Sequence, residues 1–290
     1  MPKRIFYFMK KASTSNRAAK KFELGEHIRV VPLYHPKPSV AIDDLARARQ
    51  EWDEQDLFDG KAHAVPASAH LSYQGGPLIQ KVQVFTVYWG KLWNSTSSSQ
   101  KMMADLNKFF TDILVSPLLD QLSEYNVPGQ VIGQGSFLGT KVISANSPAG
   151  SIADSAIQAQ LLSWIQANTV PQNSKNTLYF IYLDPGIVSI MGGGKSCQNY
   201  CGYHNNAGEV YYALMPYPTC SGCLGGMNAF DALTGTSSHE LCEAITDPVP
   251  GSGWYDQVNG EIGDICAWNF KKVAGYTVQL EWSNTQNKCA

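Results

Sequence analysis

The residues best suited to metal binding and catalysis lie in one short segment, Thr236–Pro248, whose pattern predicts a helix. His239 and Glu243 are four positions apart, so on a helix they share one face with Cβ atoms about 5–6 Å apart, and both can reach one metal ion. Glu240 is placed to take a proton from water on that ion. The zinc-peptidase box is H-E-x-x-H, and here Glu243 replaces the second histidine. The segment therefore predicts a metal site with an altered ligand set.

A metal held by two residues of one helix needs at least one more ligand, usually from a distant loop. Glu261 and Asp264 lie downstream, and His204 is the only other histidine beyond residue 70. Asp247 follows the helix and is either a ligand or a hydrogen-bond partner that orients His239. We expect Zn²⁺, although a carboxylate-rich set also suits Mn²⁺, Fe²⁺ or Ca²⁺.

All seven cysteines lie after residue 196. The first four form either a four-thiolate zinc knuckle or two disulfides, and the Gly, Tyr and Pro content of their loop favours disulfides. The odd count leaves at least one thiol unpaired if every bridge is internal. Cys242 is either that thiol or a partner of Cys266. Six cysteines are disulfide candidates: Cys197, Cys201, Cys220, Cys223, Cys266 and Cys289.

Composition narrows the class of protein. The chain has 290 residues, of which 44% are hydrophobic and 16% charged, so it is globular. A net charge of -2 does not indicate nucleic-acid binding. The basic run before Glu23 is interpreted as a solvated tail. No stretch approaches the ~20 apolar residues of a membrane span. Ile5–Met9 is too short for a signal-peptide core, so no conventional export signal is visible.

Two other chemistries find little support. Gly192–Lys195 lacks the spacing of a phosphate-binding loop, and no helix pattern follows it. A serine hydrolase would need a Gly-x-Ser-x-Gly elbow, which is absent from the sequence. A cysteine hydrolase would rest on Cys242, whose only nearby histidine in sequence is His239.

The elements that must position the site alternate between strands and helices. Strands are predicted at 81–89, 177–183 and 209–215, and strand or hairpin material at 130–146. Helices are predicted from the Ser95–Ser99 cap cluster, from Pro117, at 151–167 and at 227–245. This order is typical of an α/β (α+β) fold with a zincin-like mixed sheet, an active-site helix and a disulfide-rich loop region. Its last strand is expected to offer an edge for an extended peptide.

The first 68 residues differ from the rest. They contain a basic start, a proline-punctuated stretch (Val31–Pro38), a polar helix candidate near Ile42–Trp52 and an Ala/Pro linker at Ala62–Ala69. We predict that residues 1–68 are an N-terminal extension, a lid or a pro-segment. Residues 69–290 are then a zincin-like catalytic or binding domain.

Several motifs occur in an order that resembles the EXORDIUM, or phosphate-induced, protein family of plants and its microbial relatives. The resemblance spans about residues 70–268 and rests on Leu71–Leu78, Val84–Gly90, Gln100-Lys101, Cys201–His204, Cys220–Cys223, Ser238–Pro248, Trp254-Tyr255 and Glu261–Cys266. It implies a secreted or cell-wall location, disulfides and a growth-related extracellular role. On matching positions it picks out His204, His239, Glu240, Glu243, Glu261 and Asp264. The chain departs from the family in showing no signal peptide.

Two functions follow from these residues. The first is a zinc-dependent metallopeptidase that acts on a peptide or protein, with metal-activated water as nucleophile and Glu240 as general base and later proton donor. The alternative is a non-catalytic secreted EXORDIUM-like module. In that module the cluster holds a structural ion or a polar network, and Trp254 and Tyr255 contact a partner or glycan.

Overall fold

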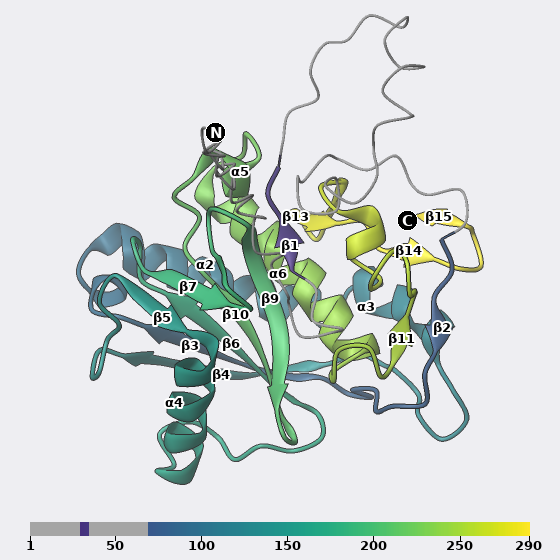
Figure 1. Ribbon diagram of the computed structural model, residues 1–290, viewed down its shortest axis with the longest axis horizontal. Coiled ribbons are helices and arrows are strands. Elements are labelled where there is room, and N and C mark those ends of the chain that lie inside the picture. The colour runs from purple at the N-terminus through teal and green to yellow at the C-terminus, as the bar shows by residue number, and fades with distance from the viewer. Residues whose placement is uncertain (1–29, 35–68) are drawn as a thin grey trace, which may run out of the picture.

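The computed structural model describes residues 30–34 and 69–290, and within them a six-stranded mixed sheet forms the centre (Figure 1). The strand order is β1-β9-β10-β6-β3-β4. The last four of these strands run parallel, while β9 is antiparallel to β10 and β1 is antiparallel to β9. Their bounds are β1 Val31–Pro32, β3 Gln83–Trp89, β4 Ser136–Ile143, β6 Thr177–Leu183, β9 Tyr200–Ala207 and β10 Val210–Met215. The predicted α/β class is confirmed.

Strand β6 is the centre of the sheet, lying between β10 and β3. All seven of its residues are buried, as its nearly continuous apolar sequence predicts for a strand covered on both faces. Phe180 and Tyr182 pack into the core on one face, whereas Tyr179 and Ile181 pack into the core on the other.

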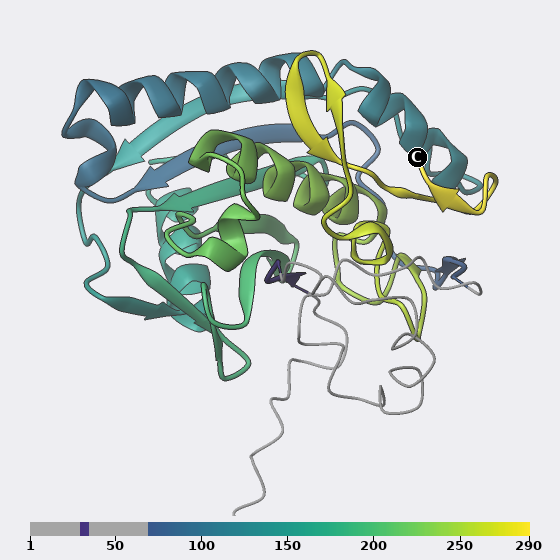
Figure 2. The same cartoon turned by 90° about the horizontal axis from the view of Figure 1, so that it is seen from above.

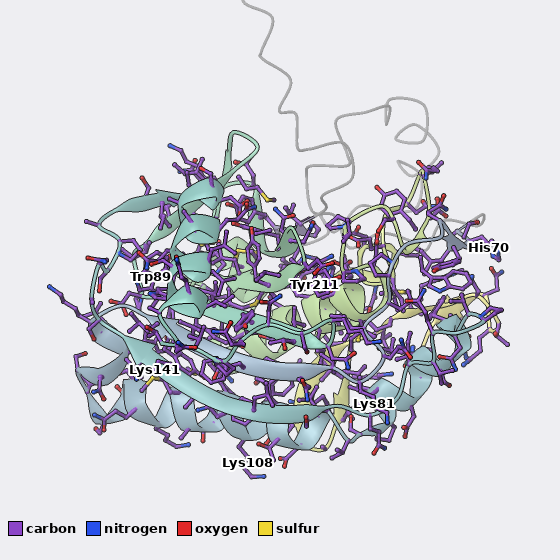
Figure 3. All side chains as sticks on the ribbon, turned by 90° about the horizontal axis from the view of Figure 1, so that it is seen from below. His70, Lys81, Trp89, Lys108, Lys141 and Tyr211 are labelled. Atoms are coloured by element: carbon purple, nitrogen blue, oxygen red, sulfur yellow. A yellow bond between two sulfur atoms is a disulfide. The ribbon has the colours of Figure 1, made fainter. Side chains whose placement is uncertain are left out.

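Helices cover both faces of the sheet (Figure 2). Helix α2 (Ser97–Ile113) and helix α6 (Ala229–Thr246) contribute to the larger core, and α4 (Asp154–Gln166) contributes to the core on the opposite face. Helix α2 begins at a capping box between Thr96 and Ser99, as the hydroxyl-rich sequence predicts. Its Lys108 points outward (Figure 3) and pairs with Asp112 at 2.7 Å.

The remaining elements are short. The helical ones are η3 Leu92–Asn94, α3 Pro117–Gln121, η4 Leu122–Tyr125, α5 Ser221–Leu224 and η5 Asp264–Cys266. The small strands are β2 Ser72–Tyr73, β5 Ser151–Ala153, β7 Val188–Met191, β8 Gly194–Lys195, β11 Trp254–Tyr255, β12 Phe270–Val273, β13 Tyr276–Gln279, β14 Trp282–Ser283 and β15 Lys288–Cys289. The helix start predicted at Pro117 is confirmed.

Two expectations were wrong. No hairpin forms at 130–146, although the strand expected there is present as β4 (Ser136–Ile143), whose sheet partner is the parallel β3. Strand β10, the last strand before α6, is not an edge, because β9 pairs with its outer side. In both cases a long-range partner, which local sequence does not encode, decides the pairing.

Some expectations fall outside the described residues. These are the helix candidate Ile42–Trp52, the linker before Ala69 and the basic run at the N-terminus. Among the helices that are described, none is long and apolar enough to cross a membrane.

Candidate metal centre

Helix α6 carries the candidate ligands through the interior of the protein. Asn228 caps its start by accepting a hydrogen bond from the Asp231 N–H at 2.9 Å, and every residue from Ala232 to Thr246 is buried. A helix buried on all sides needs small residues where neighbours approach. Gly235 supplies one such position, because a Cβ there would lie 2.8 Å from the ring of Phe270. The sequence thus places a polar helix where its histidine and glutamates cannot be solvated.

Three side chains converge on one side of this helix. His239 Nε2 lies 2.9 Å from Glu243 Oε1 and 3.9 Å from Asp264 Oδ1. Asp264 begins η5, and its backbone N–H donates a hydrogen bond of 3.1 Å to Glu243 Oε1. One ligand atom from each residue lies within 4.8 Å of the others. Asp264 therefore joins the predicted pair His239 and Glu243 in one group of possible metal ligands.

His204, on β9, sits between two groups of carboxylates. Its Nδ1 lies 3.2 Å from Glu240 Oε2 and 3.5 Å from Glu243 Oε2, while its Nε2 lies 3.4 Å from Glu261 Oε1. Burial lowers the pKa of His204, but these carboxylates more than reverse that effect and raise it well above its usual value. The surrounding carboxylates thus favour the protonated ring, in which Nδ1–H donates to Glu240. His204, Glu243 and Glu261 also form a second group of possible ligands.

The cluster contains more carboxylates than imidazoles. Glu240, Glu243 and Glu261 are fully buried, and the Asp264 side chain is 12% exposed. Within the described part of the chain, Glu240 Oε1, Glu243 Oε2 and both Glu261 oxygens accept no hydrogen bond. If all four carboxylates are ionised, two negative charges remain even when both imidazoles are protonated. The raised pKa values of Glu240 and Glu261 mean that either protons or a cation can offset this charge. Because buried unpaired charge is costly, the donor set fits a divalent cation.

The pKa values of the carboxylates diverge within this small volume. Burial raises the pKa of Glu240, and it raises that of Glu261 well above the usual value. Burial acts in the same direction on Glu243, but His239 and His204 more than offset it and hold its pKa at about 2. The ionised form of Glu243 is thus favoured, whereas Glu240 gains a proton more readily than an ordinary glutamate.

Asp247 has a different partner from the one expected. Its carboxylate accepts backbone hydrogen bonds from Gly251, Ser252 and Gly253 at 2.5–3.0 Å, which fixes the turn after α6. Its backbone carbonyl accepts from His204 Nε2 at 3.1 Å. Asp247 therefore orients His204 and not His239.

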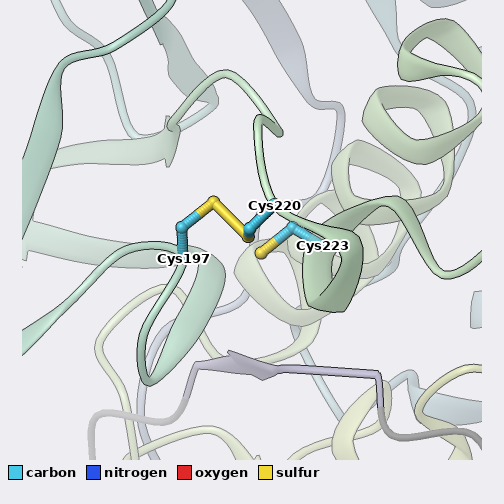
Figure 4. A group of neighbouring side chains, drawn as sticks. All are labelled: Cys197, Cys220 and Cys223. Carbon is cyan, nitrogen blue, oxygen red and sulfur yellow. A yellow bond between two sulfur atoms is a disulfide. The ribbon is translucent and has the colours of Figure 1, made fainter.

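The cysteines form three disulfides, so the zinc-knuckle alternative is wrong. Cys197 pairs with Cys220, Cys201 with Cys223 and Cys266 with Cys289, and Figure 4 shows the first pair beside Cys223. Cys242 is free and buried, and burial raises the pKa of its thiol well above the usual value. It does not bridge to Cys266. The sulfurs of the loop are consumed by disulfides and do not ligate a metal.

The sequence pattern did not predict one buried acid, Glu281. Glu281 is fully buried beside Cys242, and burial raises its pKa well above the usual value. No motif surrounds it, and its proximity to α6 depends on the fold of the C-terminal strands. Among the aromatics expected on the surface, Tyr255 is buried, and Trp254 is partly buried with its Nε1–H donating to Tyr125 O.

Gly263 offers a test of the ligand geometry that leaves the ligands themselves unchanged. A Cβ at this position would lie 2.8 Å from His239 Nδ1 and 2.9 Å from Glu243 Oε1. We expect Gly263→Ala to lower metal affinity by about 10–100-fold, as displacement of ligand-orienting groups does. Isothermal titration with Zn²⁺ measures this. Gly133→Ala is the matched control, because its nearest neighbour would be 3.9 Å away, and equal affinity of both variants would contradict the assignment.

Neither a comparison with protein-family models nor one with curated proteins finds a match to this chain.

Proposed function

We propose that the protein is a zinc-dependent metallopeptidase. The observation that carries the proposal is the convergence of His239, Glu243 and Asp264 beside Glu240, in a buried cluster whose carboxylates exceed its imidazoles. Three protein ligands with a further position open is the composition of catalytic zinc sites. Structural zinc sites, by contrast, use four protein ligands that are mostly thiolates.

Each residue has a distinct role in this proposal. His239, Glu243 and Asp264 hold the ion, which when bound would polarise a peptide carbonyl and lower the pKa of a water. Glu240 accepts the proton of that water and returns it to the leaving amine, for which a raised carboxylate pKa is suited. His204 donates to Glu240 Oε2 and so orients the other oxygen, Oε1, which has no partner within the described residues.

Glu261 and Asp247 contact His204 at Nε2, the ring nitrogen that does not face Glu240. The Glu261 carboxylate lies 3.4 Å from His204 Nε2, and the Asp247 carbonyl accepts from the same nitrogen. The Asp247 carbonyl as acceptor at Nε2, with the Glu261 charge nearby, favours a protonated ring whose Nδ1–H points to Glu240. Glu261 is then a positioning residue of the general base, and it becomes a metal ligand only if the ion occupies the second group.

A structural ion in a non-catalytic EXORDIUM-like module is the second candidate. Burial favours it, because the side chains of His204, His239, Glu240 and Glu243 are at most 1% exposed. The two candidates predict the same metal content and differ in turnover. Three disulfides fit an oxidising compartment, and we propose an extracellular location in either case.

Metal content tests the shared part of both candidates. The protein is purified, stripped with a chelator, and loaded separately with Zn²⁺, Mn²⁺, Fe²⁺ and Ca²⁺ before elemental analysis. We expect about one ion per chain for the preferred metal and its loss in His239→Ala, because that variant removes one of three ligands. Thr246→Ala, which removes only hydrogen bonds to the backbone carbonyls of Cys242 and Glu243 in the same helix, is expected to bind normally. Failure of the wild type to bind any of these ions would exclude both candidates.

A further inference from the structure

The outer edge of β9 is covered by a segment that is far away in sequence. Val31 pairs with Gly202 and Pro32 with Tyr200 in the antiparallel strand β1. An edge strand tolerates Pro32, whose missing N–H leaves no ladder bond unmade inside the sheet. The free strand edge that a peptide would use is thus filled by the chain itself.

The covering segment lies in a groove built for it. The Pro32 carbonyl accepts a 2.8 Å hydrogen bond from Trp268 Nε1, and the Tyr34 N–H donates a 2.7 Å bond to Gly222 O. The Tyr34 and Trp268 ring centroids are 5.3 Å apart. Val31 is 3% exposed and packs with the Cys201–Cys223 disulfide. Two hydrogen bonds to its main chain and two apolar contacts therefore hold this extended stretch of four residues, in addition to its pairing with β9.

Glycines shape this groove at two points. Gly222 allows Leu33 to approach, since a Cβ there would lie 3.1 Å from the Leu33 side chain. Gly225 makes room for Trp268, whose ring would come within 2.5 Å of a Cβ. Trp268 itself has a φ of +64°, a conformation that is unfavourable for a bulky residue. Strained residues of this kind persist where the surrounding structure holds a binding group in place.

The direction of the strand links the groove to the metal cluster. His204 lies on β9 two residues beyond Gly202, the partner of Val31. Because the pairing is antiparallel, a chain in the groove approaches His204 as it runs back toward its own N-terminus. Val30 already packs against the core that contains Tyr203. A peptide longer than this segment would pass the cluster on the N-terminal side of the paired valine.

We propose that the β9 edge is a peptide-binding groove, which the chain fills with its own Val31–Tyr34 segment and which accepts in trans an extended peptide with a proline and, two residues later, an aromatic residue. The carbonyl at the proline position accepts from Trp268, proline fits there because the strand needs no N–H from it, and the aromatic ring packs against the same tryptophan. Binding itself is independent of catalysis. Antiparallel pairing sets His204 opposite the peptide position two residues before the valine. That the peptide is cleaved near this position rests on the proposed peptidase function.

The test uses the full chain, folded first and opened afterwards. A recognition sequence for a site-specific protease is inserted between Gly60 and Lys61, and the folded protein is cut there. Binding of a fluorescent peptide with the sequence of residues 28–36 is followed by anisotropy before and after cutting, in the Glu240→Gln background with chelator present. We expect at least about a tenfold gain in affinity on cutting, because the tethered segment no longer competes at high effective concentration.

Two variants make the result specific. Trp268→Phe keeps the ring but loses the hydrogen bond to the proline carbonyl, so peptide affinity in the cut protein should fall about 3- to 10-fold. A peptide with alanine in place of the tyrosine should bind more weakly to the wild-type groove. Equal binding before and after cutting, or insensitivity to both changes, would overturn the groove. Peptide binding without cleavage by the metal-loaded protein would overturn only the peptidase, and cleavage of other peptides without binding of this one only the groove.

Discussion

Glu240→Gln is expected to retain its metal and to lose about 10²–10⁴-fold of its peptide hydrolysis. The substitution preserves the size of the side chain and its oxygen toward His204 Nδ1, 3.2 Å away, but removes the group that accepts a proton. The ligands His239, Glu243 and Asp264 stay in place, so binding should not change. Elemental analysis and a fluorogenic peptide library, both on Zn²⁺-loaded protein, give the two readouts.

Glu281→Gln is the matched control for this variant. Glu281 is also a fully buried glutamate of raised pKa, and it lies beside Cys242. The charges of His239 and Glu243 act on it, but it belongs to neither candidate ligand group. Because burial raises its pKa and so favours the neutral form, glutamine is a close mimic of that form, and activity should be close to wild type. If Glu240→Gln cleaved peptides as fast as this control while holding the same metal, Glu240 would not be the general base and a structural ion would be favoured.

The local part of the site could be predicted from sequence because one helix carries it. A four-residue spacing fixes His239 and Glu243 on one face whatever the fold does, and the structure places them 2.9 Å apart. Glu261 and Asp264 also reach the cluster, since the chain must turn back after Pro248 to cover α6. The path of that turn decides which downstream acid lies beside His239 and Glu243. The spacing of residues in the sequence could not show that it is Asp264.

The disulfide connectivity and the pairing of β1 with β9 could not be predicted, because both depend on contacts between segments that are far apart in the sequence. The cysteine pairs cross over, Cys197 with Cys220 and Cys201 with Cys223, because β9 and α5 run side by side only in the folded sheet. Strand β1 reaches β9 across about 170 residues of sequence, so no local pattern could show that the peptide edge is filled. The same long-range packing brings Glu281 next to α6.

The largest effect on stability is expected from metal, and it should depend steeply on pH. In the metal-free protein the pKa values of His239 and His204 are raised well above 6.5 by neighbouring carboxylates, although burial opposes this, and those of Glu240 and Glu261 are raised by burial. A raised pKa stabilises the fold below the unfolded value, and that stability is lost as pH rises through the raised pKa. Glu243, with a pKa of about 2, acts oppositely but only in acid below about pH 4.5. Between pH 5.5 and 8 the metal-free protein should therefore become less stable as pH rises.

A divalent cation takes the place of these protons, so its stabilising effect grows with pH. At pH 8 and free Zn²⁺ near 1,000 Kd, linkage gives about 4 kcal/mol, which for a domain of this size raises Tm by roughly 8–16 °C. At pH 5.5 and the same total Zn²⁺ the rise should be much smaller, because His239 must lose a proton to bind. Differential scanning calorimetry with and without Zn²⁺ at both pH values measures this, and His239→Ala should show no gain at either. A gain that was equal at pH 5.5 and pH 8 would mean that the ion binds without displacing a histidine proton. The ligand set would then be the carboxylates alone, and His239 would stabilise the fold as a buried imidazolium.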